Sequence, residues 1–366
     1  MRNLRVLDLS TTIPGAYCSR LFATSGADVV VGEPPGGSPL RLAPPSLDAG
    51  RSAAWEYLQA YKRGIVVDPD AATTTTLAGE FDLVVLSANG DAESVAARAE
   101  RLRDAYPKLV VTVVSGFGLT GSYRAWRTSG LVDWAIGGHM SLNGEPDRAP
   151  LAGGGPWVSY LVGATAAVGS QAALLRAKRT GEGDLVDVGG MEAIGAAHQW
   201  SMTLYTHQGI VKRRWGNRHG ESFHPLSLHP CADGWVCIAA VSPNQWEGLC
   251  IAMDQVALLI DDSLYSPAAR FDRADELDVL INGWTSERST AELVEALQAN
   301  RCPAGRVATL TETLADEHLV YRGFWATPEH LGPNAAMPSL PFQIGSVRPP
   351  FRRAPDLGEH QTEVVA

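Results

Sequence analysis

The stretch VLDLSTTIPGAYCSRLFATSGADVVVGEPPGGSPLR, Val6 to Arg41, decides the fold. Its apolar run Val6 to Leu9 predicts a buried strand, the segment Tyr17 to Thr24 has helical composition, and Ala27 to Val31 resumes a buried strand. Parallel strands need a crossover of this kind, and ligands of such sheets bind beyond the carboxyl ends of the strands. The stretch therefore predicts a β-α-β unit whose first candidate binding loop is Thr11 to Gly15.

This loop does not match the common nucleotide-binding motifs. Only Gly15 falls inside it, no G-x-G-x-x-G follows the first strand, and the chain contains no G-x-x-x-x-G-K-[ST]. On this segment alone, an ordinary β-α turn without a ligand stays an alternative.

Composition and length limit the class of protein. A chain of 366 residues predicts two domains, or one domain with a large insertion, and 45% hydrophobic residues are enough for a substantial core. The formal net charge of −10 argues against a nucleic-acid surface, and no basic tract favours a membrane. An anionic ligand would therefore have to be met by a few local Lys and Arg side chains.

The cysteines and the chain start predict the compartment. Five scattered cysteines without C-x-x-C or Cys/His spacing are typical of core residues in a reducing compartment and argue against a metal site. They are Cys18, Cys231, Cys237, Cys250 and Cys302. No signal sequence opens the chain and no apolar run approaches about 18 residues, so we expect a cytoplasmic protein.

Strands and helices alternate as far as Ser115, which predicts a doubly wound α/β, Rossmann-like sheet. A short strand is expected over Leu185 to Val188, followed by a break at Gly189 and Gly190 and one helix over Met191 to Tyr205. We predict a large domain over residues 1–211, a linker loop with a small α+β domain over 212–321, and a tail over 322–366 that packs back on the large domain.

Eight segments in this order resemble the family III CoA-transferases of the CaiB/BaiF type, which include formyl-CoA and carnitine-CoA transferases. They are the opening β-α-β unit, SGFGLTGSY, TGEGDLVDVGGMEA, RRWGNRHGESFHP, DGWVCIAA with the following QW, ELVEALQANRCPAGRV, ADEHLVYRGF and LGEH. The resemblance implies a Rossmann-like large domain, an inserted small domain and an interlocked dimer. It also implies transfer of CoA from an acyl-CoA donor to a carboxylic acid.

The resemblance implies a carboxylate nucleophile that forms an acyl anhydride and then a CoA thioester with the enzyme. Glu192 fits this role because it follows a strand and a Gly-Gly break near the start of a helix, where the helix dipole favours an ionised carboxylate. The family usually has Asp at this position. An ordinary acidic residue of a first helical turn is the alternative for Glu192, and Asp187 is a second candidate that alternates with apolar residues as a structural residue would.

The resemblance further implies contacts with CoA. The first-crossover loop would lie along CoA, and a Lys-Arg pair would meet its phosphates, with one more arginine as a weaker candidate. These residues are Thr11, Thr12, Ile13, Pro14, Gly15, Lys62, Arg63 and Arg41. Solvated surface charges are the alternative for the cations. Where the family has an Asn-Phe-Arg-Pro-Gly turn, this chain has Ser87 to Asp91 and lacks the arginine.

A glycine-containing loop matches the family's mobile active-site loop. Such a loop would close over the nucleophile and exclude water from a hydrolysable intermediate. It consists of Gly216, Asn217, Arg218, His219 and Gly220. A plain connection between two domains is the alternative.

Two other functions stay open. An α-methylacyl-CoA racemase needs a histidine opposite the carboxylate, but the matching stretch reads Ser129-Gly130-Leu131-Val132-Asp133, and His139 lies further along. A catalytically silent CoA-binding subunit is the other alternative. The protein would be a homodimer, or a heteromer with a paralogue.

Five tryptophans give a further hypothesis about the acid. Together they would suit a roomy, aromatic-lined pocket for a bulky or ring-containing acid, although tryptophan is also a common core residue. They are Trp126, Trp134, Trp157, Trp200 and Trp215.

Overall fold

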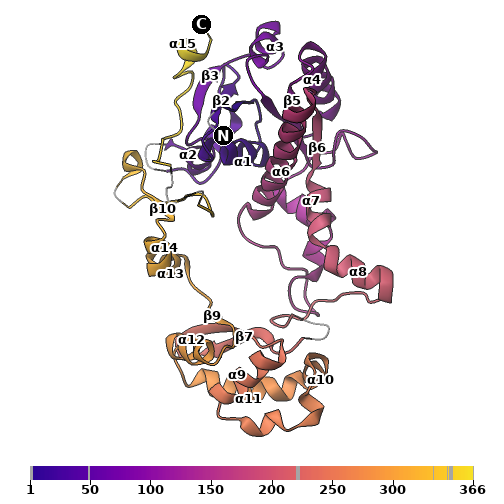
Figure 1. Cartoon of the computed structure of the whole chain (residues 1–366), viewed down its shortest axis with the longest axis vertical. Helices are drawn as coiled ribbons and strands as arrows, with labels where there is room; N and C mark the ends of the chain where they lie inside the picture. Colours follow the sequence, from indigo (N-terminus) through magenta and orange to yellow (C-terminus); the bar gives the residue numbers. More distant parts are fainter. Residues whose placement is uncertain are drawn as a thin grey trace. The chain divides into compact units, whose positions relative to one another are not determined.

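The computed structural model describes residues 3–47, 50–219, 223–332, 334–343, 345 and 349–365 (Figure 1). The chain forms two compact units. Unit 1 contains residues 1–139, 154–199 and 314–366, and unit 2 contains residues 140–153 and 200–313. These units have other boundaries than the domains that the sequence suggests, and the division at residues 211 and 321 stays a prediction.

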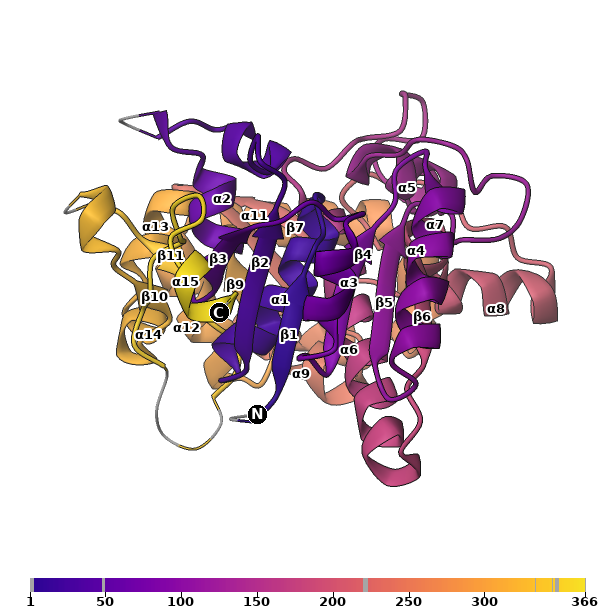
Figure 2. The ribbon, with the colours of Figure 1, turned by 90° about the horizontal axis from the view of Figure 1, so that it is seen from above.

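Unit 1 is built on a six-stranded sheet in which all paired strands are parallel, as predicted (Figure 2). The strand order is β3-β2-β1-β4-β5-β6. The bounds are β1 (Arg5–Asp8), β2 (Asp28–Glu33), β3 (Arg63–Val66), β4 (Leu83–Ser87), β5 (Val110–Ser115) and β6 (Leu185–Gly189). From β1 the chain winds outward to β3, and from β4 it winds in the opposite direction, so the winding reverses between β1 and β4.

Helices cover both faces of this sheet because its strands are apolar on both sides. Val84 and Leu86 of β4 join the core under one set of helices, whereas Leu83 and Val85 join the core under the other set. The first set is α3 (Ala72–Ala78) and α4 (Ala92–Ala105), and the second is α1 (Ile13–Thr24), α6 (Trp157–Thr180) and α7 (Gly190–Ala197). The short helices α2 (Ala53–Leu58) and α5 (Gly130–Ile136) complete unit 1 before its tail.

Helix α6 is long and apolar enough to cross a membrane, and 33% of its most apolar window is buried. In unit 1 it packs against α1, β5 and β6. Gly163 allows the close approach to α1, because a Cβ at this position would lie 2.5 Å from the carbonyl oxygen of Pro14.

The expected helix over Met191 to Tyr205 is two helices. Helix α7 ends at Ala197 and α8 (Gln199–Gln208) follows. His198 between them is buried, and its backbone N–H bonds the carbonyl of Gly195 at the end of α7. The apolar pattern runs through this break, so the sequence signal for two helices is weak.

Unit 2 contains an antiparallel sheet in the order β7-β8-β9, with helices packed on it. The strands are β7 (Leu226–Cys231), β8 (Gly234–Ala239) and β9 (Ala304–Arg306). The helices are α9 (Pro243–Ala252), α10 (Pro267–Asp272), α11 (Ala274–Ser286), α12 (Thr290–Ala299) and the boundary helix α13 (Leu310–Ala315). Ser242 and Ser289 begin α9 and α12 with capping boxes, which satisfy the free N–H groups of the first turns.

The C-terminal segment contains α14 (Glu317–Tyr321), β10 (Trp325–Ala326), β11 (Met337–Pro338) and α15 (Gln361–Val364). Its end, from Pro355 to α15, contacts the outer edge of the unit 1 sheet at β3. The amide side chain of Gln361 accepts a hydrogen bond from Val66 N at 2.7 Å and donates one to Val66 O at 3.2 Å. The tail therefore covers part of the outer edge of β3.

Candidate active site

A cavity of about 210 Å³ lies at the carboxyl edge of the sheet, where the winding reverses. Loops that follow β1, β4 and β5 form it, together with the starts of α5 and α6. The lining residues are Thr12, Ile13, Pro14, Ala88, Asn89, Val114, Ser115, Gly116, Thr128, Ser129, Gly130, Asp133 and Ser159. Doubly wound proteins bind their ligands at this point of the sheet. A larger hollow of about 650 Å³ lies at the opposite edge of the sheet, where the strands begin, next to Leu4 and Asp82. It is therefore not at the edge where ligands of such sheets bind.

The predicted first-crossover loop forms part of the cavity wall. Thr12, Ile13 and Pro14 line the cavity, and Pro14 stands in the first turn of α1, where proline needs no N–H partner. Thr11 N donates to Ser87 Oγ at 2.9 Å and so ties the loop to the end of β4. Gly15 lies against Ser10, which leaves no room for a Cβ. Three residues of the loop therefore line the cavity, and the other two fix its shape.

Glu192 stands in the first turn of α7, two residues after the glycine that begins this helix, and its side chain is exposed. Its carboxylate folds back over the end of β6, since a Cβ built on Gly189 would lie 3.0 Å from Glu192 Oε2. The same point is 3.3 Å from the backbone N of Gly118, in the loop after β5. The positive end of the helix dipole favours a negative charge here.

The first turn of α7 is also in contact with the cavity wall. Met191 N donates to Gly116 O at 2.9 Å, and a Cβ on Gly190 would lie 2.7 Å from Asp133 Oδ2. Gly116 and Asp133 both line the cavity. The helix that carries Glu192 thus shares a wall with the cavity.

The sequence alone did not single out Asp133 as a functional residue. Its side chain is buried, and burial raises the pKa of this carboxyl to about 6, although the hydrogen bond from Thr128 lowers it. Thr128 Oγ1 donates to Asp133 Oδ1 at 2.5 Å. The available signal was an acid within the apolar segment GLVDWAI, after the N-cap Ser129.

Asp187, the second candidate for the nucleophile, is exposed and binds the loop after β5. Its Oδ2 accepts a hydrogen bond from Leu119 N at 2.9 Å and lies against Gly118. The carboxylate fastens the loop after β5 to β6, which agrees with the structural alternative for this residue.

The position of Lys62 argues against the predicted contact with a CoA phosphate. Its ammonium is fully buried and donates to Asp8 Oδ2 at 3.0 Å, to Ser19 Oγ at 2.7 Å and to two further oxygens. Burial lowers the pKa of this ammonium, and the charge of Asp8 opposes the effect. A buried charge must be paired, and the pair lies inside unit 1 under the first-crossover loop.

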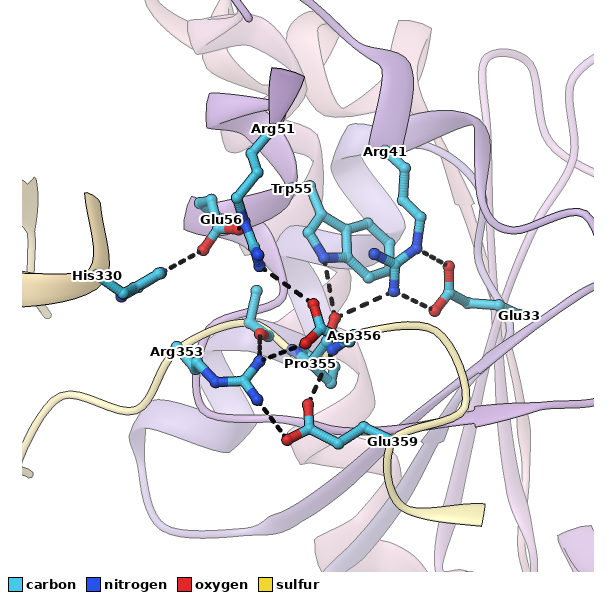
Figure 3. Close-up of polar contacts among 11 residues, drawn as sticks. Glu33, Arg41, Arg51, Trp55, Glu56, His330, Arg353, Pro355, Asp356 and Glu359 are labelled. Carbon is cyan, nitrogen blue, oxygen red and sulfur yellow. Dashed lines mark hydrogen bonds and ion pairs between the residues drawn. The ribbon is translucent and has the colours of Figure 1, made fainter. Parts of the chain in front are cut away.

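Arg41 and Arg63 are each paired with a carboxylate. Arg41 donates to both oxygens of Glu33, at 2.7 and 2.8 Å, and stacks on Trp55 with 3.9 Å between guanidinium carbon and ring centroid (Figure 3). Arg63 binds Asp28 in the same bidentate way, at 3.0 and 2.6 Å. The structure therefore holds both cations in internal ion pairs, and their contact with CoA stays a prediction.

The predicted active-site loop lies in unit 2, and its last residue, Gly220, is outside the described residues. Gly216 has a positive φ of 60°, and a Cβ there would lie 2.6 Å from a Glu145 carboxylate oxygen. Arg218 donates to Asp278 Oδ2 at 2.5 Å and to Asp275 Oδ1 at 2.7 Å. Asn217 lines a third cavity, of about 370 Å³, and His219 N donates to Leu226 O at 3.0 Å. Closure of this loop over Glu192 stays a prediction.

The histidine required for racemase chemistry does not line the cavity of unit 1. His139 packs against His198, with 4.6 Å between ring centroids, and lies beside Trp134 and Trp157. None of the five tryptophans of the bulky-acid hypothesis is among the described lining residues of this cavity. Within the described ranges, no cluster of three His, Cys, Asp or Glu side chains could hold a metal ion.

Comparisons with known proteins agree with one another. A family model described as CoA-transferase family III matches residues 1–361. Succinyl-CoA--D-citramalate CoA-transferase of Chloroflexus aurantiacus is 33% identical, over 87% of this chain and 81% of that protein. Succinyl-CoA:(R)-benzylsuccinate CoA-transferase subunit BbsE of Thauera aromatica is 31% identical, over 99% and 92%. The crystal structure of a CAIB/BAIF family protein from Brucella suis superposes with a TM-score of 0.83 at 24% identity, over 99% of this chain and 98% of that one.

Proposed function

This chain belongs to CoA-transferase family III, and from that premise we propose that Glu192 is the nucleophile through which it moves CoA from an acyl-CoA to a carboxylic acid. One observation carries the proposal. The Glu192 carboxylate is exposed on the first turn of α7, at a glycine-lined corner, and this turn touches the wall of the cavity at the reversal of the sheet.

The chemistry requires four displacements. Glu192 attacks the thioester carbonyl, the C–S bond breaks, and CoA leaves as a thiolate from an enzyme-bound acyl anhydride. The thiolate attacks the glutamyl carbonyl, which releases the donor acid and leaves a glutamyl-CoA thioester. The acceptor carboxylate attacks this thioester to form a second anhydride, and the thiolate then takes the new acyl group and restores the Glu192 carboxylate.

The surroundings of Glu192 suit these steps. Gly189 and Gly190 leave space for a thioester to approach, and the start of α7 stabilises the carboxylate that leaves in the last step. In this proposal the loop from Gly216 to His219 closes over the anhydride, because water would hydrolyse it. Asp187 holds the neighbouring loop and does not react.

CoA lies along the first-crossover loop in this proposal, with Thr12 to Pro14 in contact with it. Arg41 and Arg63 stay candidates for binding the CoA phosphates. Each would have to leave its present carboxylate partner, Glu33 or Asp28, to bind a phosphate. Lys62 is no longer a candidate, since its ammonium would have to leave a buried ion pair.

We also propose that two copies of the chain form the interlocked dimer that the family implies. Large apolar side chains are exposed on α6 and α8, and a partner would cover them. They are Val168 and Leu175 of α6, and Trp200, Met202 and Tyr205 of α8. A heteromer with a paralogue is the variant of this proposal, because the relative from Thauera aromatica is named as a subunit. We expect the assembly in the cytoplasm.

A transfer assay tests the proposed nucleophile. The purified protein is given acetyl-CoA or succinyl-CoA and a panel of carboxylic acids, and new acyl-CoA is separated by chromatography. Glu192→Gln should lower transfer at least 1,000-fold, whereas the control Glu182→Gln, also an exposed glutamate of unit 1, should stay within twofold. Undiminished transfer by Glu192→Gln would refute the assignment. Exchange of the α-hydrogen without transfer would indicate a racemase, and tight CoA binding without either activity would indicate a silent subunit.

A further inference from the structure

Asp133 places a carboxyl group in the wall of the cavity without a cation to pair with it. The residue is 4% exposed, and Oδ1 accepts the hydroxyl of Thr128 at 2.5 Å. Among the described residues, Oδ2 has no hydrogen-bond partner and lies against Gly190. The residue is mostly buried, and a ligand group that donates a hydrogen bond to this carboxylate oxygen would compensate for the water that burial removes.

The remaining lining of the cavity determines which ligands fit. The described lining residues include no Lys, Arg or His. The polar ones besides Asp133 are the hydroxyl and amide residues Thr12, Asn89, Ser115, Thr128, Ser129 and Ser159. A second carboxylate in this cavity would meet the charge of Asp133 with no cation to offset it, whereas a hydroxyl group would give Asp133 Oδ2 the donor that it lacks.

The cavity is also close to the proposed nucleophile. Asp133 packs on the residue that begins α7, and Gly116 O accepts the N–H of the next residue, Met191. Glu192 follows directly on the same turn. A group bound in the cavity therefore lies beside the helical turn that carries the reacting carboxylate.

We propose that Asp133 determines the specificity of the transfer: the acid whose acyl group enters this cavity carries an uncharged hydrogen-bond donor, such as a hydroxyl group, in place of a second carboxylate. The inference rests on the function proposed above and names its substrate class. It separates this chain from the two relatives whose names specify succinyl-CoA, because a succinyl group carries a second carboxylate.

Three acceptor acids of equal length test the inference. Butyrate, 4-hydroxybutyrate and succinate differ only in the terminal group, and one acyl-CoA donor serves all three. The wild type should use 4-hydroxybutyrate with a kcat/KM at least tenfold above that for succinate. Asp133→Asn should raise kcat/KM for succinate at least tenfold and change butyrate by less than twofold. Asp70→Asn removes the charge of an exposed carboxylate that binds Arg98, and should change none of the three.

Other results would overturn the inference. A wild type that prefers succinate contradicts it without any variant, so the test survives if Asp133→Asn does not fold. Equal changes for all three acids would mean that Asp133 contacts CoA or supports α7 instead of reading the acid. Equilibrium binding of the same acids to the CoA-loaded protein needs no transfer, and there too succinate should bind at least tenfold more weakly than 4-hydroxybutyrate.

If the wild type transferred CoA to none of the acids tested, that result would count against the proposed function. Transfer with unchanged selectivity in Asp133→Asn would count against this inference alone.

Discussion

Lys62 and Asp8 form a fully buried ion pair, and this pair indicates a structural role for Lys62. The Lys62 ammonium also donates to Ser19 Oγ, Gln59 Oε1 and the carbonyl oxygen of Ala16. Removing one partner of such a pair leaves an uncompensated buried charge. The residue is therefore expected to support the fold under the first-crossover loop and not to bind a phosphate.

Lys62→Met should lower the free energy of unfolding by about 3–5 kcal/mol, measured by urea denaturation. Arg98→Met, which breaks the more exposed pair with Asp70, should cost about 0–1 kcal/mol. A Lys62→Met protein with wild-type stability and weakened CoA binding would instead support the original prediction that Lys62 contacts a CoA phosphate.

The pKa of Asp133 predicts how selectivity depends on pH. Burial raises this pKa to about 6, and among the described residues no charged side chain of α6 or α7, including Glu192, contributes to the shift. The carboxyl is ionised above pH 6 and neutral below it. Discrimination against succinate in the wild type, relative to Asp133→Asn, should therefore be full at pH 7.5 and fall several-fold by pH 5.5. A ratio that stays constant over this range would show that the charge of Asp133 does not act on the acid.

The raised pKa of Asp133 also predicts how the stability of the fold depends on pH. A carboxyl whose pKa is higher in the folded chain binds its proton more tightly there, so its contribution to stability is present at low pH and is lost as pH rises through about 6. Asp133→Asn should therefore raise the melting temperature at pH 8 more than at pH 5. The opposite order in scanning calorimetry would contradict the buried environment of this carboxyl.

Helix α7 depends on the absence of a side chain at residue 190. A Cβ there would lie 2.7 Å from Asp133 Oδ2, so Gly190→Ala must displace either the carboxyl or the first turn that carries Glu192. We expect Gly190→Ala to lower both the melting temperature and the transfer rate, the rate by at least tenfold. In the Asp133→Ala background the loss should be much smaller, because the clash is gone. Additive losses in this double-mutant cycle would show that the two residues are not in contact.

The strands and the longer helices could be predicted from the sequence because their patterns are local. Runs such as Leu83 to Leu86 are apolar on both faces, which is typical of a parallel sheet covered by helices. The pair Gly189-Gly190, which ends β6 and begins α7, gave the place of Glu192 for the same reason. The end of α7 at His198 was missed, since no glycine or proline marks it.

The state of the charged residues could not be predicted from the sequence. Lys62 and Arg63 are adjacent, yet one is buried against Asp8, 54 residues away, and the other is half-buried against Asp28. Asp133 likewise acquires its surroundings from loops after three different strands. Such environments depend on contacts between distant segments, and no local pattern carries them.

The exposed apolar side chains of α6 and α8 lead to a prediction for the assembly. Sedimentation velocity at micromolar concentration should give a species of twice the 39.0 kDa chain mass. If the two chains interlock, tagged and untagged dimers should not exchange subunits within a day under native conditions, but should mix after denaturation and refolding. A monomer, or exchange within minutes, would contradict the interlocked arrangement.

The most direct test of the proposed reaction is to identify the residue that becomes acylated. The protein is incubated with an acyl-CoA that it uses and then treated with hydroxylamine, which converts a glutamyl thioester or anhydride into a hydroxamate, and its peptides are sequenced by mass spectrometry. We expect a hydroxamate at Glu192, present only when acyl-CoA is added and absent from Glu192→Gln. A hydroxamate at another residue, or efficient transfer with Glu192 unmodified throughout, would contradict the assignment of Glu192 as the nucleophile.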